Sequence, residues 1–87
     1  MRYRYVKLTP DQFRAGLLEA GIPLERFCKL TGTDRRRAQR YITGVEDIPP
    51  WVGSYLAMLT RPDARAIAHA YADAYATLAD NVDTPEG

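Results

Sequence analysis

The residues best suited to chemistry are the arginines that cluster between positions 26 and 40. This stretch holds six basic residues and one acidic residue, Asp34. A guanidinium group is planar and always charged, and its donors match phosphate oxygens and base edges. Such a cluster predicts a surface that binds a polyanion. A merely solvated helix face is the plain alternative for any charge run, so the surrounding residues must decide.

The charge of the chain is unevenly distributed, although the net charge is only +1. Residues 1–47 contain ten Lys and Arg against six Asp and Glu, whereas residues 48–87 contain two against five. A basic patch on a nearly neutral chain indicates that one face meets the polyanion.

Composition excludes several other classes of protein. The 87 residues correspond to one domain, and the single cysteine, Cys28, excludes an internal disulfide. With one histidine, His69, a Cys/His zinc finger is excluded too. Cys28 is expected to be a buried small residue and His69 a surface helix residue. The chain shows no paired catalytic residues, phosphate loop, membrane span or signal peptide. We therefore expect a cytoplasmic protein that is not an enzyme and needs no cofactor or metal.

Proline and glycine divide the chain into five predicted helices, so the expected fold class is all-α. Thr9 and Asp34 are suitable N-caps, and Gly32 is expected to take a positive φ in a tight turn. Trp51 and Tyr55 are assigned to the core rather than to a ligand site. The windows are residues 10–20, 22–31, 35–42, 51–59 and 62–80, and the first carries an apolar stripe of Phe13, Leu17, Leu18 and Ala20.

The fifth window has alanine at every second position, which taken alone resembles strand alternation. Alanine is however the best helix former and a poor strand former. The bulky residues Ile67, Tyr71, Tyr75 and Leu78 follow helical spacing. They predict a helix that packs on its own domain with one side and forms a dimer interface with the other.

The basic cluster falls on two short helices joined by a Gly-containing turn, which is the pattern of a helix-turn-helix. Ala38 and Tyr41 are predicted to hold the second helix on the core. This leaves an outer face of basic and amide side chains near the start of that helix, where base edges are reached in a major groove. The face consists of Arg35, Arg36, Gln39 and Arg40.

Residues 9–59 resemble the Cro/repressor-like (XRE-type) helix-turn-helix DNA-binding domains, in particular small stand-alone regulators of phage and anti-CRISPR-associated type. The resemblance is carried by Gly21-Ile22, Cys28, Gly32, Asp34, Tyr41, Gly44 and Ile48-Pro49-Pro50. It implies a five-helix, lambda-repressor-like domain. It also implies base reading by Arg35, Arg36, Gln39 and Arg40, and phosphate contacts by Arg37, Lys29 and Thr43.

The sequence departs from the family pattern at three places. Leu24 stands where many members have a phosphate-binding glutamine, and Glu46 and Asp47 follow the second helix where many members are basic. These two carboxylates should repel phosphate if they face it. Leu17 stands where many members have an arginine, and Ile42 stands where they have the glutamate that pairs with it. Replacing such an ion pair by two apolar residues is often neutral or stabilising for the fold.

The sequence thus predicts an N-terminal arm (residues 1–8), a DNA-binding domain (9–60), a dimerisation helix (61–80) and a tail (81–87). Tyr3 and Tyr5 of the arm fit a dimer strand, a core cover or a disordered arm equally. The expected function is a dimeric repressor of its own operon that binds a palindromic operator in double-stranded DNA, with no small-molecule ligand. The alternative is a helix-turn-helix module for protein contacts or DNA packaging, as in a small terminase-like or antitoxin-like subunit.

Overall fold

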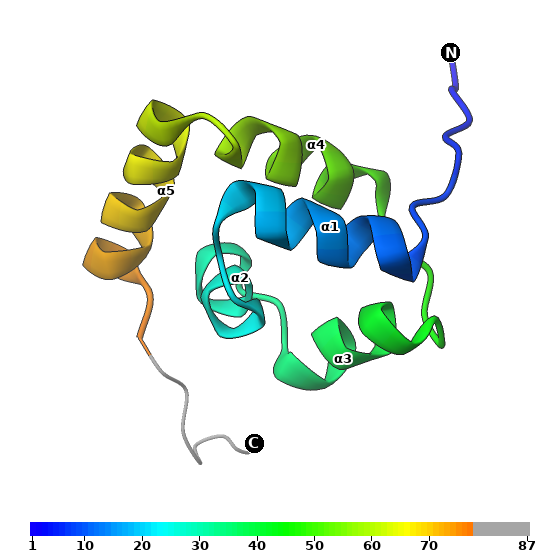
Figure 1. Cartoon of the computed structure of the whole chain (residues 1–87), viewed down its shortest axis with the longest axis horizontal. Helices are drawn as coiled ribbons and strands as arrows, with labels where there is room; N and C mark the ends of the chain where they lie inside the picture. Colours follow the sequence, from blue (N-terminus) through cyan, green and yellow to red (C-terminus); the bar gives the residue numbers. More distant parts are fainter. Residues whose placement is uncertain (78–87) are drawn as a thin grey trace.

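The computed structural model describes residues 1–77, and within that range the chain is all-helical apart from one isolated bridge pairing (Figure 1). The all-α fold class is therefore confirmed. The five helices of the described range are α1 (Pro10–Ala20), α2 (Leu24–Thr31), α3 (Arg35–Thr43), α4 (Pro50–Leu59) and α5 (Pro62–Tyr75).

Helix α1 lies between α4 and α3. It contacts both of them, while α2 contacts α3 and α5, and α4 contacts α5. In Figure 1, α4 lies above α1 and α3 lies below it, with α2 and α5 on the opposite side from the N-terminal arm. Helix α3 is consequently covered on its inner face only, and its outer face lies at the surface of the molecule.

The local sequence explains where the helices begin and end. The Thr9 hydroxyl accepts a hydrogen bond from the Gln12 N–H, and the Gln12 side chain accepts one from the Thr9 N–H, which completes a capping box for α1. Asp34 caps α3 by accepting a hydrogen bond from the Arg36 N–H at 3.1 Å. Gly32 ends α2 with a φ of +72°, which costs other residues about 1–2 kcal/mol. These three predictions are confirmed.

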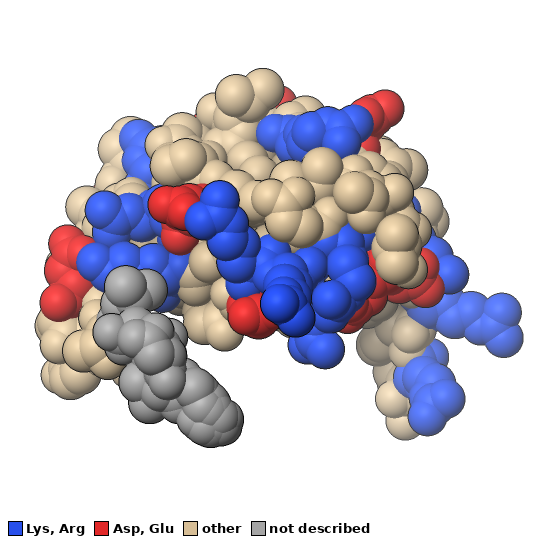
Figure 2. Space-filling view, turned by 90° about the horizontal axis from the view of Figure 1, so that it is seen from below, with Lys and Arg blue, Asp and Glu red and all other residues tan. Residues whose placement is uncertain are grey.

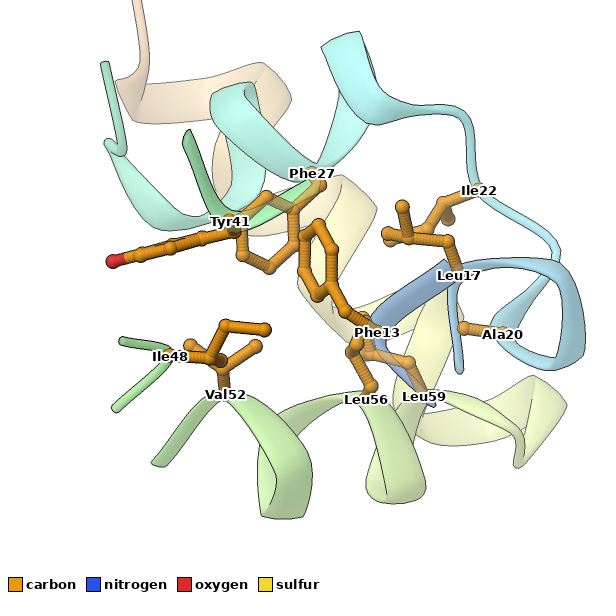
Figure 3. Close-up of a cluster of buried hydrophobic side chains, with 10 residues drawn as sticks. All are labelled: Phe13, Leu17, Ala20, Ile22, Phe27, Tyr41, Ile48, Val52, Leu56 and Leu59. Atoms are coloured by element: carbon orange, nitrogen blue, oxygen red, sulfur yellow. The ribbon is translucent and has the colours of Figure 1, made fainter. Parts of the chain in front are cut away.

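The core is organised around the ring of Phe13 on α1 (Figure 3). This ring meets Phe27 of α2 and Tyr41 of α3 edge to face, with centroids 5.3 Å and 5.7 Å away. Edge-to-face pairs add to the free energy of burial because the positive edge of one ring faces the negative face of the other. The buried cluster comprises Phe13, Leu17, Ala20, Ile22, Phe27, Tyr41, Ile48, Val52, Leu56 and Leu59.

Helix α5 packs on the other helices through alanines and one arginine. Ala72 is buried, and Ala68 packs against the core. The Arg65 guanidinium donates hydrogen bonds to the carbonyls of Ala20 at 2.8 Å and Leu59 at 3.4 Å, which lie at the ends of α1 and α4. Carbonyls at helix ends lack intrahelical partners, so one side chain satisfies two helix ends and joins α5 to both.

Two core assignments made from the sequence are wrong. Leu18 is 82% exposed, because it follows the buried Leu17 and is turned about 100° around α1, away from the core. Trp51 is 46% exposed, since it lies in the first turn of α4 at the margin of the core. Tyr55 packs against the core as expected, and its ring contacts Trp51 edge to face.

Helix α5 is shorter than the sequence predicts. It ends at Tyr75, and Ala76 has an extended backbone with φ −90° and ψ 129°, whereas the predicted helix continued to Asp80. In the described part of the chain, Ala72 is the last buried residue. Short helices depend on tertiary packing, and beyond Ala72 no buried residue up to position 77 supports another turn. Residues 78–80 lie outside the described range.

The N-terminal arm runs away from the helices in Figure 1, and Tyr3 and Tyr5 are exposed. The interpretation of these tyrosines as a core cover is therefore wrong. The arm joins the fold at Leu8, which forms an antiparallel bridge with Ile48 and packs against the core. A dimer strand and an extended arm stay hypotheses for the residues before it.

Replacing Phe13 with alanine tests the central position of this ring. We expect a loss of about 3–5 kcal/mol in the free energy of unfolding, because the cavity removes contacts to two other rings. In a domain of this size such a loss is close to the whole stability. The control is Leu18→Ala, which should change the free energy by less than about 0.5 kcal/mol. Urea unfolding followed by circular dichroism measures both, and equal effects would contradict the assignment.

Candidate nucleic-acid interface

Helix α3 presents two different faces. Ala38 and Tyr41 are buried, and Ile42 packs against the core, which confirms the predicted inner side. The side chains predicted to read bases share the other side because their spacing of three and four residues places them on one face of a helix. Of these residues, Arg35, Arg36 and Gln39 are exposed and Arg40 is half-buried.

Basic side chains gather on the side of the molecule where α3 lies. Figure 2 shows this side, with Lys and Arg side chains at its centre and Asp and Glu side chains directly beside them. The face is therefore not uniformly positive. The local charge on this face depends on which arginines are paired with carboxylates and which are not.

Three arginines of α3 are paired with carboxylates. Arg35 at the first turn contacts Glu25 of α2. Arg37 and Arg40 share Glu46, which follows α3 in the loop to α4; the Arg37 Nε and Arg40 Nε atoms lie 3.0 Å and 2.8 Å from its two oxygens. The Arg35–Glu25 pair is exposed on both sides, and such a pair contributes at most about 1 kcal/mol, so another anion can replace Glu25 at little cost.

The side chains of Arg36 and Gln39 make no hydrogen bond or ion pair within residues 1–77. They lie at the middle of the exposed face, between the pairs at either end of the helix. Arginine donates to guanine O6 and N7, and glutamine bonds adenine N6 and N7. These two side chains are thus the ones that are immediately free to bond an incoming partner.

The turn before α3 is fixed by hydroxyl groups. The Thr31 hydroxyl donates to the Phe27 carbonyl at 2.8 Å and shares a hydrogen bond with the Thr33 hydroxyl at 2.6 Å. Asp34 then caps the helix. Since the side chains of these residues satisfy the local backbone, the start of α3 has a defined direction relative to α2.

The predicted phosphate-binding residues lie in three different surroundings. Arg37 is joined to Glu46. Lys29 on α2 donates to Asp73 of α5 at 2.8 Å, so its ammonium group lies beside α5. The Thr43 hydroxyl donates to the Arg40 carbonyl at 3.3 Å at the end of α3. The structure brings Arg37 and Thr43 to the α3 surface but places Lys29 between α2 and α5.

Asp73 links α5 to α2 through a second residue as well. Arg26 lies 3.2 Å from the same carboxylate oxygen that Lys29 contacts. These hydrogen bonds, from Lys29 first and Arg26 second, lower the pKa of Asp73. Two residues of the basic stretch therefore hold α5 in place, which the sequence alone did not indicate.

A shallow depression on the surface borders α3 and the start of α4. Arg37, Arg40, the Tyr41 edge and Trp51 line it together with the turn between α2 and α3. In Figure 3 the Tyr41 hydroxyl points away from the core cluster. Burial raises the pKa of this hydroxyl, and the charge of Glu46 raises it further. Trp51, the only tryptophan of the chain, lines the same depression as Arg37 and Arg40.

The predicted dimer residues lie on the outer side of α5. Ile67, Tyr71 and Tyr75 are exposed, and the two tyrosine rings are 4.7 Å apart between centroids. The opposite side of α5 carries the packed residues Ala68 and Ala72. Helix α5 thus uses one side for its own domain, as predicted, and leaves an apolar side uncovered. Leu78 lies outside the described residues.

Sequence reasoning missed two residues that organise this surface. Glu46 was expected to repel phosphate, yet its carboxylate contacts two arginines. Arg14 of α1 donates to the Ile42 carbonyl at 3.1 Å and so satisfies the end of α3. The pairing of Glu46 with these arginines could have been predicted from its position directly after a basic helix. No local pattern connects Arg14 with a carbonyl so far along the chain.

Other chemistry has little support in the described range. Residues 1–77 contain no group of three or more His, Cys, Asp or Glu side chains that could hold a metal ion. None of the helices in that range combines the length and apolar character required to cross a bilayer. Cys28 is half-buried, and burial raises the pKa of its thiol even though the charge of Arg35 opposes this. A raised pKa is the reverse of what a nucleophilic cysteine needs.

Comparison of the chain with protein-family models, with curated proteins and with solved structures finds no match. The assignment of a function therefore depends on the residues and geometry of the surface around α3.

Alkylation of Cys28 tests the description of this thiol. We expect iodoacetamide to react more slowly with the folded protein at about pH 8 than with a small free thiol, because a raised pKa leaves less thiolate. Mass spectrometry follows the reaction, and urea-unfolded protein is the control that should react at the ordinary rate. A folded-state rate equal to the unfolded one would contradict the raised pKa.

Proposed function

We propose that the chain is a sequence-specific DNA-binding transcriptional regulator, in which α2 and α3 form a helix-turn-helix of the Cro/repressor type. The observation that carries the proposal is the exposed face of α3, where three arginines and a glutamine share one side of a helix that Ala38 and Tyr41 anchor. The defined turn at Gly32 and the cap at Asp34 support it.

The dimensions of α3 suit a major groove. An α-helix with its side chains is about 10–12 Å across, which fits the width of about 12 Å of that groove in B-DNA, and the nine residues of α3 extend about 13 Å along it. Its side chains include both Arg, which suits guanine, and Gln, which suits adenine. In this proposal Arg35, Arg36, Gln39 and Arg40 read bases.

Phosphate contacts would flank this helix. Arg37 and Thr43 lie at the α3 surface and serve this role in the proposal. Lys29 joins them only by leaving Asp73, at the modest cost of an exposed ion pair. Phosphate contacts fix the register of a protein on DNA, whereas base contacts determine its sequence preference.

A dimer completes the proposed regulator. One domain offers a single recognition helix, and a symmetric pair doubles the contacts and matches a palindrome. The uncovered side of α5, with Ile67, Tyr71 and Tyr75, supplies an apolar surface for a second copy. Repression of its own operon is the role that the resemblance implies for such a dimer.

Selection from a random duplex library tests the function. The protein should enrich an inverted repeat with half-sites about one helical turn apart. If a dimer neutralises roughly 6–10 phosphates, its affinity should fall about 10³-fold or more between about 50 and 200 mM salt. No enrichment together with a flat salt response would contradict the proposal and favour a module for protein contacts, whereas salt-dependent binding without enrichment would favour a DNA-packaging module.

Replacing Arg36 with alanine tests base reading by a side chain that has no partner in the described chain. We expect a loss of about 1–3 kcal/mol on the selected duplex and a smaller loss on random duplex. The matched control is Arg61→Ala, which removes an exposed arginine at the start of α5. Fluorescence anisotropy of labelled duplex measures both. Equal losses on the two duplexes would make Arg36 a phosphate contact.

Replacing Tyr71 with glutamate tests the dimer surface. Tyr71 is 68% exposed, so we expect the monomer to fold while a buried charge disfavours the dimer. Light scattering should report a monomer with unchanged helical circular dichroism and weaker binding to the inverted repeat. Met58→Glu is the control, since Met58 is also an exposed apolar residue but lies on α4. A Tyr71→Glu protein that stays dimeric would place the interface elsewhere.

A further inference from the structure

One carboxylate holds two arginines of α3. The Glu46 Oε1 atom accepts a hydrogen bond from the Arg40 Nε at 2.8 Å, and the Oε2 atom lies 3.0 Å from the Arg37 Nε. The Glu46 side chain is 31% exposed, less than either arginine. A carboxylate with a separate partner for each oxygen, on consecutive turns of one helix, differs from an incidental surface ion pair.

The backbone places Glu46 at this position. After α3 the chain reverses at Gly44, and the Glu46 N–H donates to the Arg40 carbonyl at 3.3 Å. Two residues later Ile48 is buried and bridges to Leu8. The loop is thus fixed on both sides of Glu46, so the carboxylate is directed over the last turns of α3.

The atoms that Glu46 contacts determine what the arginines can still do. Both ion pairs use the Nε atom of the guanidinium. Only the Arg40 Nε–H donates a hydrogen bond to Glu46. A guanidinium is a rigid planar fork, so this directed hydrogen bond also fixes the direction of the two terminal nitrogens of Arg40. Those terminal nitrogens form an edge that is able to bond guanine O6 and N7, or two phosphate oxygens, in bidentate fashion.

The charge of Glu46 and the orientation that it imposes on an arginine have opposite effects on the affinity for DNA. A carboxylate on a DNA-binding face repels every phosphate, whatever the sequence of the duplex. An arginine already held in one orientation loses less side-chain freedom on binding, and this benefit is realised only where the base edges match. The two effects can therefore be separated by comparing matched and unmatched DNA.

We propose that Glu46 is a positioning residue that sets specificity: it orients the terminal edge of Arg40 for the matched site and weakens binding to all other DNA. This inference rests on the proposed function. It assigns the orientation of a base-reading arginine to a residue that touches no base itself.

Three substitutions separate the two effects. Glu46→Gln removes the charge and keeps the shape, whereas Glu46→Asp keeps the charge but is too short to reach both arginines. Asp47→Asn is the matched control, because Asp47 lies on the same loop and its carboxylate pairs with Lys7 of the arm rather than with α3. Each variant is measured on the selected duplex and on a scrambled duplex of equal length, with thermal unfolding as a check of folding.

The expected results differ for each variant. For Glu46→Gln, affinity for scrambled duplex should rise about 2- to 5-fold, and the ratio of selected to scrambled affinity should fall about 10-fold or more. For Glu46→Asp the ratio should fall with scrambled affinity unchanged. For Asp47→Asn both affinities should rise by the same factor. Fluorescence of Trp51, which borders Arg37 and Arg40, should change on binding in the wild type.

Three outcomes would overturn the inference. An unchanged ratio in Glu46→Gln, while the wild type still prefers the selected duplex, would leave the proposed function standing and remove the positioning role. Lower thermal stability with both affinities reduced equally would make Glu46 a structural residue. A wild type without any preference between duplexes would instead remove the proposed function itself, and the inference with it.

Discussion

The edge-to-face contacts of Phe13 are the interaction on which the rest of the structure depends. They join α1 to α2 through Phe27 and to α3 through Tyr41. The angle at which α3 leaves the core is set by rings of fixed shape rather than by flexible aliphatic chains. The tyrosine hydroxyl points away from this cluster, and Tyr41 lines a depression together with Arg37 and Arg40, so the same residue connects the core to the arginines of α3.

The positive charge of the α3 surface is partly neutralised by neighbouring carboxylates. A helix with four arginines would repel itself strongly and bind any polyanion, yet Glu25 and Glu46 neutralise part of the charge at its two ends. The centre of the face, at Arg36 and Gln39, keeps its donors free within the described chain. In the proposed complex with DNA, reduced general attraction would leave a larger share of the binding energy to groups that distinguish one base pair from another.

The fold could be predicted from the sequence wherever residues close together in the chain determine the structure. Caps such as Thr9 and Asp34 act within three residues, and the buried side of α3 follows from helical spacing. Errors arose where the tertiary contact decides. Leu18 and Trp51 are as apolar as their buried neighbours, and only the packing of α1 and α4 excludes them from the core. Likewise, the residues of the α3 face follow from the pattern, but their carboxylate partners do not.

Helix α5 shows why such long-range contacts matter for the site. Arg65 bonds the ends of α1 and α4, and Asp73 pairs with Lys29 and Arg26. Two cations of the basic stretch are thus directed toward α5, and the stretch is not one uniform basic surface. The division follows helix geometry: residues on α2 turn toward α5, while those on α3 turn outward. A count of basic residues along the sequence therefore overstates the positive charge on the outer face of α3, and the arrangement of the helices decides which arginines face outward there.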